Sequence, residues 1–192
     1  PALTGRVLGA LRMFCSARFL TVGPGLKSGI KLRLDNPAQL GAELLCGAVA
    51  ALEEGPGPLA VISADTAISI MAVNGKQELV GGVILPGPQL SLSALVQKTA
   101  QLPQIDLSAP ASSSILGKNT SACLQNGFVL GTAGLLDGLA ERFQAELGPD
   151  IRFYATGNLP RTIREACRTP IQYREYLITN GLYRIWQKNR KG

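Results

Sequence analysis

The sequence predicts a mixed α/β fold, and three observations indicate it. Apolar segments of strand length follow one another at 59–62, 69–73 and 78–85. Asn74-Gly75, between the last two segments, is typical of a hairpin turn. A further apolar segment at 151–155 follows a long stretch with helical spacing. A strand meander combined with helices is typical of a sheet with helices packed on its faces.

The chain before the meander is expected to contain a helix and two short strands. Leu8, Leu11 and Phe14 recur at helical spacing, and residues 30–34 alternate apolar with basic side chains as a strand does. The elements predicted in order are a helix within 4–19, a buried strand from Phe19 to Val22, a turn at Gly23-Pro24-Gly25 and a strand from Ile30 to Leu34.

A second helix is expected to start between Asp35 and Ala42. Asn36 suits an N-cap and Pro37 a first helical position, but Gly41 interrupts, so a start at Ala42 is an equal alternative. Glu43 is the only carboxylate between Asp35 and Glu53. It either complements the positive end of the helix dipole or acts chemically beside the glycine. The apolar face is predicted to comprise Leu44, Leu45, Ala48, Val49 and Leu52.

The remaining elements are predicted from breakers and periodicity. Glu54 to Pro58, EGPGP, is the clearest candidate for a hinge or domain boundary. Gly131 is a candidate break in a long helical stretch. The predicted elements are a helix over 91–100, a Pro/Ser loop over 104–114, a helical stretch over 122–147, a strand over 151–155, and helices over 160–168 and 175–189.

The amino-acid composition limits the classes of protein to which this chain could belong. The chain has 192 residues, is 46% hydrophobic, and contains no apolar run long enough to span a bilayer. It has no histidine, and its four cysteines are widely spaced, which argues against a zinc site. The cysteines are predicted to be buried reduced thiols in a cytoplasmic protein. Residues 151–192 carry nine Lys/Arg and two Glu, a net +7. We interpret this charge as a solvated helix face and expect no nucleic-acid partner.

Several motifs together resemble the type III pantothenate kinase family. They occur in the family's order and span nearly the whole chain. They are VGPGLKSGI at 22–30, DNPAQLGAELL at 35–45, GGVILPG at 81–87, KTAQLP at 98–103, ILGKNT at 115–120, LQNGFVLG at 124–131, ATGNLP at 155–160 and NGLYRIWQKN at 180–189. The resemblance implies a ribonuclease-H-like fold of the actin and sugar-kinase superfamily. It implies a truncated first domain remaining over 1–55 and a second domain over 56–192.

The resemblance also implies phosphorylation of pantothenate by ATP, the first step of coenzyme A synthesis, with Mg²⁺ and a monovalent cation, K⁺ or NH₄⁺. Glu43 falls at the position of the family's catalytic Asp. Gly41, Ala42 and Leu44 match pantothenate-holding positions. Thr120 matches a pantothenate-contacting Thr, and it could also cap the helix that follows. Leu34 stands where many relatives have a substrate-contacting Tyr. Relatives are dimers, so a homodimer is expected.

The motif that approaches the ATP phosphates departs from the family. Relatives have D-x-G-T-A-T-T where this chain has SADTAIS at 63–69. Ser63 replaces the cation-binding Asp, Asp65 replaces the Gly, and Thr66 keeps an ATP-contacting identity. Asp65 could hold a cation two residues along from Ser63, although loss of the site is the stronger interpretation.

No D-x-G-N-T phosphate loop occurs in the chain, which therefore resembles the C-terminal three-quarters of a family member. We expect it to be inactive as a kinase. The alternative is a non-catalytic dimeric binding or regulatory protein on the same fold.

Overall fold

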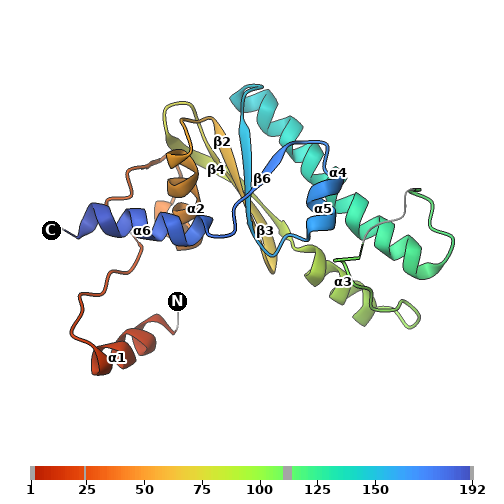
Figure 1. The fold of residues 1–192 in the computed structure, drawn as a ribbon, viewed down its shortest axis with the longest axis horizontal. Coiled ribbons are helices and arrows are strands. Elements are labelled where there is room, and N and C mark those ends of the chain that lie inside the picture. The colour runs from red at the N-terminus through yellow and green to blue at the C-terminus, as the bar shows by residue number, and fades with distance from the viewer. Residues whose placement is uncertain (1–2, 24, 110–113, 191–192) are drawn as a thin grey trace.

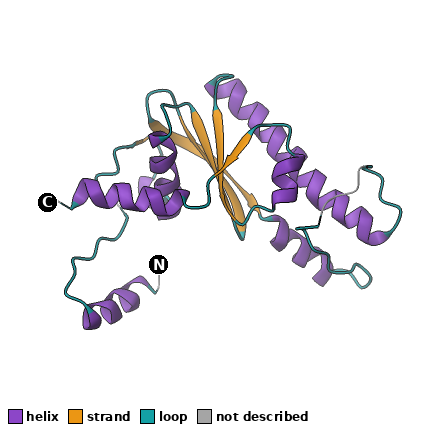
Figure 2. Cartoon of the chain, in the orientation of Figure 1, coloured by secondary structure: helices purple, strands orange, loops and turns teal. Residues whose placement is uncertain are grey.

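A six-stranded mixed sheet forms the centre of the protein, as a computed structural model shows (Figures 1 and 2). The structure describes residues 3–23, 25–109 and 114–190. The strand order is β1-β4-β3-β2-β5-β6. The strands are β1 (Lys31–Leu32), β2 (Leu59–Ala64), β3 (Ala67–Val73), β4 (Glu78–Pro86), β5 (Arg152–Gly157) and β6 (Ile171–Tyr173). The helices are α1 (Thr4–Phe14), α2 (Ala42–Glu53), α3 (Pro88–Gln97), α4 (Thr120–Leu147), α5 (Arg161–Ala166) and α6 (Leu177–Asn189). The predicted mixed α/β class is confirmed.

Local signals build the antiparallel half of the sheet. β2, β3 and β4 form the predicted meander, with Leu59 opposite Val73 and Ala67 opposite Pro86. The Asn74 side-chain oxygen accepts from the backbone N–H of Lys76 at 2.9 Å and of Glu78 at 3.0 Å, so Asn74 fixes the turn. Gln77 rather than Gly75 takes the left-handed conformation, with φ +59°.

Long-range pairing builds the parallel half. β5 and β6 run parallel to β2, and α4 makes the crossover into β5. β6 was not predicted from the sequence, because three residues are too few to show a period of two. Gly131 does not break α4, whose 28 residues form one continuous helix. Tertiary contacts here outweigh the weak helix propensity of glycine.

Two hydrophobic cores cover the two faces of the sheet (Figure 1). On one face, α2 packs with α6 over Val61, Met71 and Tyr154. On the other face, α4 and α5 cover the alternate positions of the same strands, including Ile62 and Ile70. The strict alternation along β2 explains why its apolar run is continuous: both of its faces are buried.

Both predicted helix starts near Asn36 occur, as separate elements. Pro37–Gln39 form a 3-10 turn, capped by the Asn36 side-chain oxygen, which accepts from Ala38 N–H at 3.2 Å. α2 then starts at Ala42 with Gly41 as its N-cap. The predicted apolar face lies inward: Leu44, Leu45, Ala48 and Val49 are buried, and Leu52 is partly buried.

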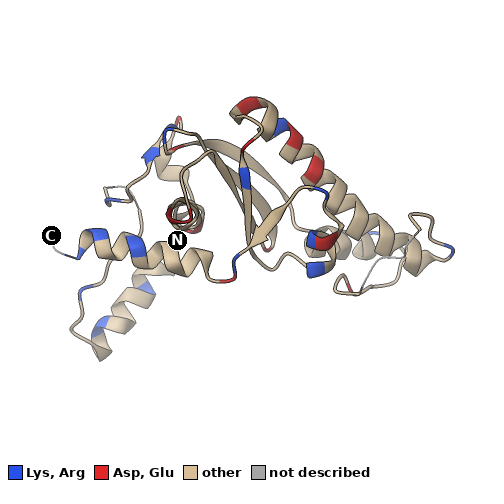
Figure 3. Ribbon diagram, turned by 45° about the horizontal axis from the view of Figure 1, so that its top comes forward, with Lys and Arg blue, Asp and Glu red and all other residues tan. Residues whose placement is uncertain are grey.

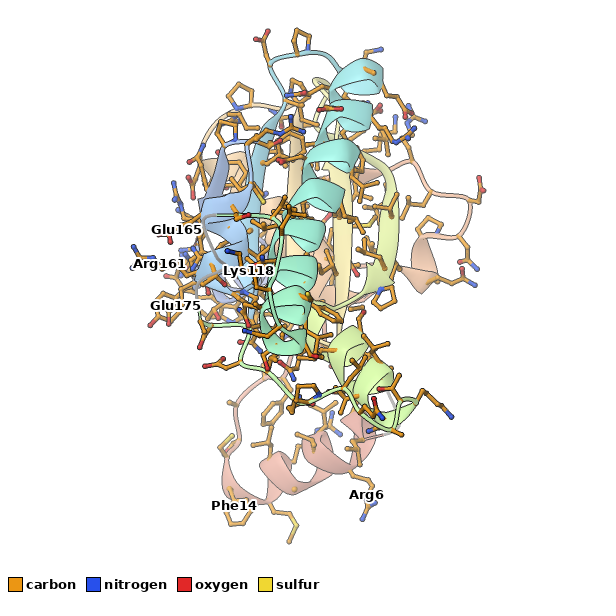
Figure 4. The ribbon with its side chains drawn as sticks, turned by 90° about the vertical axis from the view of Figure 1, so that its right-hand side faces the viewer. Arg6, Phe14, Lys118, Arg161, Glu165 and Glu175 are labelled. Atoms are coloured by element: carbon orange, nitrogen blue, oxygen red, sulfur yellow. The ribbon has the colours of Figure 1, made fainter. Side chains whose placement is uncertain are left out.

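Residues 3–17 differ from the core in having little support. α1 has no buried residue, and Phe14, which is 87% exposed, points away from the rest of the chain (Figure 4). Phe19–Val22 does not form the predicted strand, because no neighbouring strand pairs with it within the described residues. Pro24, in the predicted Gly-Pro-Gly turn, and 110–113, in the predicted loop, lie outside the described residues.

The segment Glu54–Pro58 is held beside the amino ends of β2 and β5. The Arg152 guanidinium donates to the carbonyl oxygens of Glu54 and Pro56, and Arg174 donates two hydrogen bonds of 2.7 Å to the Glu54 carboxylate. A Cβ on Gly57 would lie 2.5 Å from the carbonyl oxygen of Asn74, so only glycine fits there. The segment predicted as a hinge is therefore tightly packed.

The cysteine prediction was wrong in part. All four thiols are free, as expected, but only Cys46 is buried, whereas Cys15 and Cys123 are exposed. Cys15 is exposed because it follows the unsupported α1, and Cys123 because it lies in the first turn of α4, beyond the sheet. Within the described residues, no helix is both long and apolar enough to cross a membrane.

Candidate active site

α2 directs its first turn toward the carboxyl end of β2. Residues 54–58 connect the end of α2 to the start of β2. The Arg152 side chain donates to the backbone just after α2, and the first residue of β2 pairs with Arg152 in the sheet. α2 therefore runs antiparallel to β2. A Cβ on Gly47 would lie 3.1 Å from Val61 Cγ1, which places the middle of α2 over Val61. Four residues of helix rise about 6 Å, the length of about two strand residues, so Glu43 lies near the level of Ser63.

The start of α2 is open to ligands. Gly41, Ala42 and Glu43 are exposed, whereas Leu44 is buried in the core. No hydrogen bond or ion pair of the Glu43 carboxylate is found in the described part of the chain. A cavity of about 260 Å³ adjoins this turn, and it is lined by Ala42, Leu45 and the 22–32 segment. Leu34 is partly buried against the core.

A second pocket, of about 410 Å³, lies at the carboxyl ends of β2 and β5. Parallel strands that end beside one another commonly form ligand sites in α/β proteins. Asp65 and Thr66 form one wall, and Pro88 at the start of α3 forms another. Asn158 donates a 2.9 Å hydrogen bond from its side-chain amide to the Asp65 carboxylate. Asp65 is the only charged residue that lines this pocket.

Three hydroxyl groups lie in a row across the sheet beside this pocket. Ser63 is paired with Ser69 on β3 and with Thr156 on β5. Alternation places all three on the face covered by α2. Thr156 is 1% exposed and its hydroxyl donates to the Glu175 carbonyl at 3.4 Å. The motif identified Ser63 but not Thr156, because only the pairing of β2 with β5 places the two residues side by side.

Thr120 starts α4 but is not its cap. The Asn119 side chain accepts from the backbone N–H of Ala122 at 2.9 Å, so Asn119 is the N-cap and the capping alternative for Thr120 is wrong. Thr120 is exposed and lines an apolar cavity of about 330 Å³ with Leu95, Leu124 and Phe128. No hydrogen bond of its hydroxyl occurs among the described residues.

A single chain does not bring Thr120 and Glu43 together. α2 belongs to the core on one face of the sheet and α4 to the core on the other (Figure 1). The 28 residues of α4 measure about 42 Å, and the six of β2 about 20 Å, so the first turns of α4, before Val129, extend past the sheet. Within one chain, Thr120 and Glu43 therefore lie on opposite faces of the sheet and do not share a cleft.

Charged residues are distributed unevenly along the chain (Figure 3). Lys and Arg residues lie on α1 and α6, and acidic residues gather at the last turns of α4. The described residues contain no group of three or more Cys, Asp or Glu side chains able to hold a metal ion together. The oxygen atoms near the candidate site that could bind a cation are those of the hydroxyl row and of the carboxylates of Asp65 and Glu43.

Comparisons with known proteins agree with the motifs. The family model described as type III pantothenate kinase matches residues 1–142. The chain belongs to the type III pantothenate kinase family. A type III pantothenate kinase of Koribacter versatilis is 37% identical over 94% of this chain and 66% of its own length. Those of Dehalococcoides mccartyi strain BAV1 and Geotalea uraniireducens are 37% and 35% identical, over 99% and 100% of this chain and 72% and 74% of their own lengths.

The family assignment agrees with the fold. The sheet and its flanking helices are those of an actin-like and sugar-kinase-like protein, as the resemblance implied. A crystal structure from Campylobacter jejuni, named for the Baf family of transcriptional activators, matches with a TM-score of 0.58 and 18% identity. That match covers 100% of this chain and 80% of the other. At this identity the match supports the fold alone. This chain spans about two thirds to three quarters of the curated relatives named above.

Proposed function

We propose that the chain carries the pantothenate-phosphorylating site of its family in an impaired form, with little or no turnover by itself. The observation that supports this most is that two predicted parts of the site lie at the same end of one strand. Glu43, at the start of α2, and the Ser63–Thr66 turn both lie at the carboxyl end of β2. Phosphoryl transfer needs a proton acceptor beside the phosphates, and this edge is where both could meet.

In this proposal each residue has a stated role. The Glu43 carboxylate accepts the proton of the pantothenate hydroxyl, and its exposed, unengaged position suits that role. Gly41, Ala42 and Leu44 hold pantothenate at the start of α2, Leu44 through its backbone because its side chain is buried in the core. Thr66 contacts ATP in the pocket that it lines. Thr120 contacts pantothenate through its hydroxyl, which is not used to cap α4.

Three substitutions weaken catalysis. Asp65 places a carboxylate where a phosphate would approach, and like charges about 4 Å apart repel by roughly 1 kcal/mol in water and by more at a protein surface. Ser63 supplies a neutral oxygen in place of a carboxylate for the monovalent cation. Glu43 is one methylene longer than Asp, and a displacement of about 1 Å can cost on the order of 100-fold in rate.

The family implies ATP, Mg²⁺ and a monovalent cation as cofactors. The hydroxyls of Ser63, Ser69 and Thr156 are oxygen donors, which K⁺ or NH₄⁺ accepts, but they bring no negative charge. Mg²⁺ is usually bound through one or two carboxylates together with substrate phosphates. Asp65 is the one carboxylate in the pocket that could take that role.

A homodimer in the cytoplasm is part of the proposal. Thr120 and Glu43 lie on opposite faces of the sheet in one chain. A second copy would offer the alternative in which Thr120 of one subunit approaches Glu43 of the other. We also propose the division into residues 1–55 and 56–192 as the family's two domains.

The test is phosphopantothenate formation from ATP and pantothenate with Mg²⁺ and K⁺. The chain is expected to give less than 1% of a typical kinase turnover of about 1 to 100 per second. The triple variant S63D, D65G and E43D is expected to raise the rate at least about 100-fold. Turnover in the typical range by the unmodified chain would contradict the impairment. A triple variant that stays inactive and does not bind pantothenate would contradict the site.

The second candidate is a non-catalytic dimeric binding or regulatory protein. The observation that favours it is the pocket beside Thr66, which has one carboxylate and no Lys or Arg among its lining residues. Pantothenate and adenosine would bind such a protein without reaction. Binding of both, with no product even from the triple variant, is the result expected of this candidate.

A further inference from the structure

The Asp65–Thr66 turn is clamped from two sides. On one side Gly87, just before α3, donates its N–H to the Thr66 carbonyl at 2.9 Å, and a Cβ on Gly87 would lie 2.3 Å from the Asp65 carbonyl oxygen. On the other side Gly157 has φ +83°, and its Cβ would lie 2.3 Å from the Ala64 carbonyl oxygen. Two glycines thus approach the backbone on either side of Asp65 closely, and a hydrogen bond ties the turn to Gly87.

A side-chain contact restrains Asp65 as well. The Asn158 amide donates to Asp65 Oδ1 at 2.9 Å, and the Asn158 backbone N–H donates to the Ala64 carbonyl at 2.5 Å. Asn158 is therefore fixed at its backbone and aimed at Asp65 by its side chain. Both side chains line the same pocket. The two residues are 93 positions apart in the sequence, so only the fold brings them together.

The pocket has no Lys or Arg among its lining residues, and the basic residue nearest to it along the chain is engaged elsewhere. Arg161 is the basic residue nearest to Asn158 along the chain. Its side chain makes a 2.6 Å ion pair with Glu165 on the outer surface of α5 (Figure 4). The other polar groups of the pocket, on Thr66, Gln89 and Ser93, are uncharged. A phosphate group entering the pocket would therefore meet a carboxylate with no compensating side-chain charge from the lining residues.

We propose that Asn158 is a positioning residue that holds the Asp65 carboxylate against this pocket, and that the held carboxylate makes the pocket prefer an uncharged nucleoside to a nucleoside triphosphate. The inference rests on the proposed function, which places the ATP site at Thr66. It goes further in naming the residue pair that sets the charge preference of the site. Without the amide, the carboxylate can rotate toward water, and its repulsion of phosphate falls.

The test is a binding titration of the full chain with adenosine and with ATP in EDTA, followed by two-dimensional NMR. The variants are D65N, N158A and the double variant, and D150N is the matched control, because Asp150 is exposed and lies beyond the opposite end of β5. D65N is expected to bind ATP about tenfold more tightly, with adenosine affinity changed less than about twofold. N158A is expected to bind ATP about threefold more tightly. D150N is expected to change neither affinity.

The double variant separates positioning from a simple structural role. Once Asp65 is neutral, N158A should have no further effect on ATP binding. An equal N158A effect with and without the carboxylate would overturn the positioning role. Adenosine binding with an ATP-to-adenosine ratio that D65N leaves unchanged would overturn this inference while leaving the nucleotide pocket intact. No adenosine binding by any variant would overturn both.

Discussion

The two ends of β2 use charge in opposite ways. At the amino end, the Glu54 carboxylate is held by two 2.7 Å hydrogen bonds from Arg174, and Arg152 closes the segment onto the sheet. At the carboxyl end, the Asp65 carboxylate faces a pocket and receives one neutral amide donor, from Asn158. One strand therefore has a charge-compensated end and an end whose charge is exposed to a ligand.

The difference separates stability from binding. A carboxylate matched by a guanidinium fork stabilises the fold and offers little to a ligand. A carboxylate with a single amide partner contributes little to stability and dominates the electrostatics of its pocket. Changes at the amino end should therefore alter the free energy of unfolding, and changes at the carboxyl end should alter binding.

The largest expected effect tests the tight packing at the amino end. Gly57→Ala would place a methyl group 2.5 Å from the Asn74 carbonyl oxygen, which belongs to the backbone and cannot rotate away. We expect a loss of about 3 kcal/mol in the free energy of unfolding, measured by urea denaturation. Gly75→Ala in the adjacent turn is the control, because a Cβ there meets nothing within 4 Å. It should stay within about 1 kcal/mol of wild type. Equal losses from the two variants would show that the packing argument fails.

A buried carboxylate on α4 tests whether a charged group stabilises the fold when several hydrogen-bond donors surround it. Asp137 accepts from the backbone N–H groups of Arg168 and Thr169 at 2.9 to 3.0 Å. Burial raises the pKa of the Asp137 carboxyl, but these hydrogen bonds outweigh burial and leave the pKa below its ordinary value of 3.8. Asp137→Asn is expected to cost about 2 kcal/mol at pH 7.

The pH dependence of this cost has a definite sign. Because the folded pKa is the lower one, the contribution of Asp137 is complete above about pH 3.8 and is lost as the pH falls through the folded value. The difference between wild type and Asp137→Asn in urea denaturation should therefore shrink below pH 3.8. A difference that stays constant down to the acid transition would refute the role of the charge. Asp150→Asn, which removes an exposed carboxylate, is the control and should change the free energy of unfolding by less than about 0.5 kcal/mol at pH 7.

A smaller effect is expected from the ion pair at the amino end. The Arg174 and Glu54 side chains are 42% and 32% exposed, so water screens part of their attraction. Glu54→Gln is expected to cost about 1 kcal/mol in the free energy of unfolding and to leave adenosine binding unchanged. Glu165→Gln breaks the pair with Arg161, whose side chains are 60% and 79% exposed, and should cost less than about 0.5 kcal/mol. A larger cost for Glu165→Gln would reverse the ranking.

The smallest effect on stability is expected at the carboxyl end. Asp65→Asn removes a charge but keeps a side chain that can still accept from Asn158. The free energy of unfolding should change by less than about 0.5 kcal/mol, by the same denaturation measurement. A loss as large as that of Glu54→Gln would show that Asp65 supports the fold, and the contrast between the two ends of β2 would disappear.

The sequence was sufficient to predict the elements whose signals are local. The meander over 59–86 combines apolar strands with Asn74, whose side chain fixes the turn. The apolar spacing of α2 predicted its buried face. Phe19–Val22 was predicted as a strand from its composition, but a strand also needs a neighbour, and none pairs with it in the described structure. β6 was missed for the converse reason, since its pairing with β5 defines it.

The sequence was enough to select the residues of the candidate site, but less of their arrangement in space could be predicted from it. Motif resemblance selected Glu43, Thr66 and Thr120, and the structure places the first two at one edge of the sheet. The separation of Thr120 from Glu43 could not be read from the sequence, because it follows from which face each helix covers. The contact between Asp65 and Asn158 joins two motifs that were considered separately.

Because α4 is long, a small tilt of its packed part would displace its first residue by a larger distance. Its second half is fixed by Asp137, which is bound to the loop after α5, and by its packing on the sheet. Val129 is the first residue of α4 in this core, and Thr120 lies nine residues before it, about 14 Å along the helix axis. A tilt of about 8° at Val129 would move Thr120 by about 2 Å, enough to make or break a hydrogen bond. Small adjustments deep in the core are thereby magnified at the tip of α4, where a substrate contact is proposed.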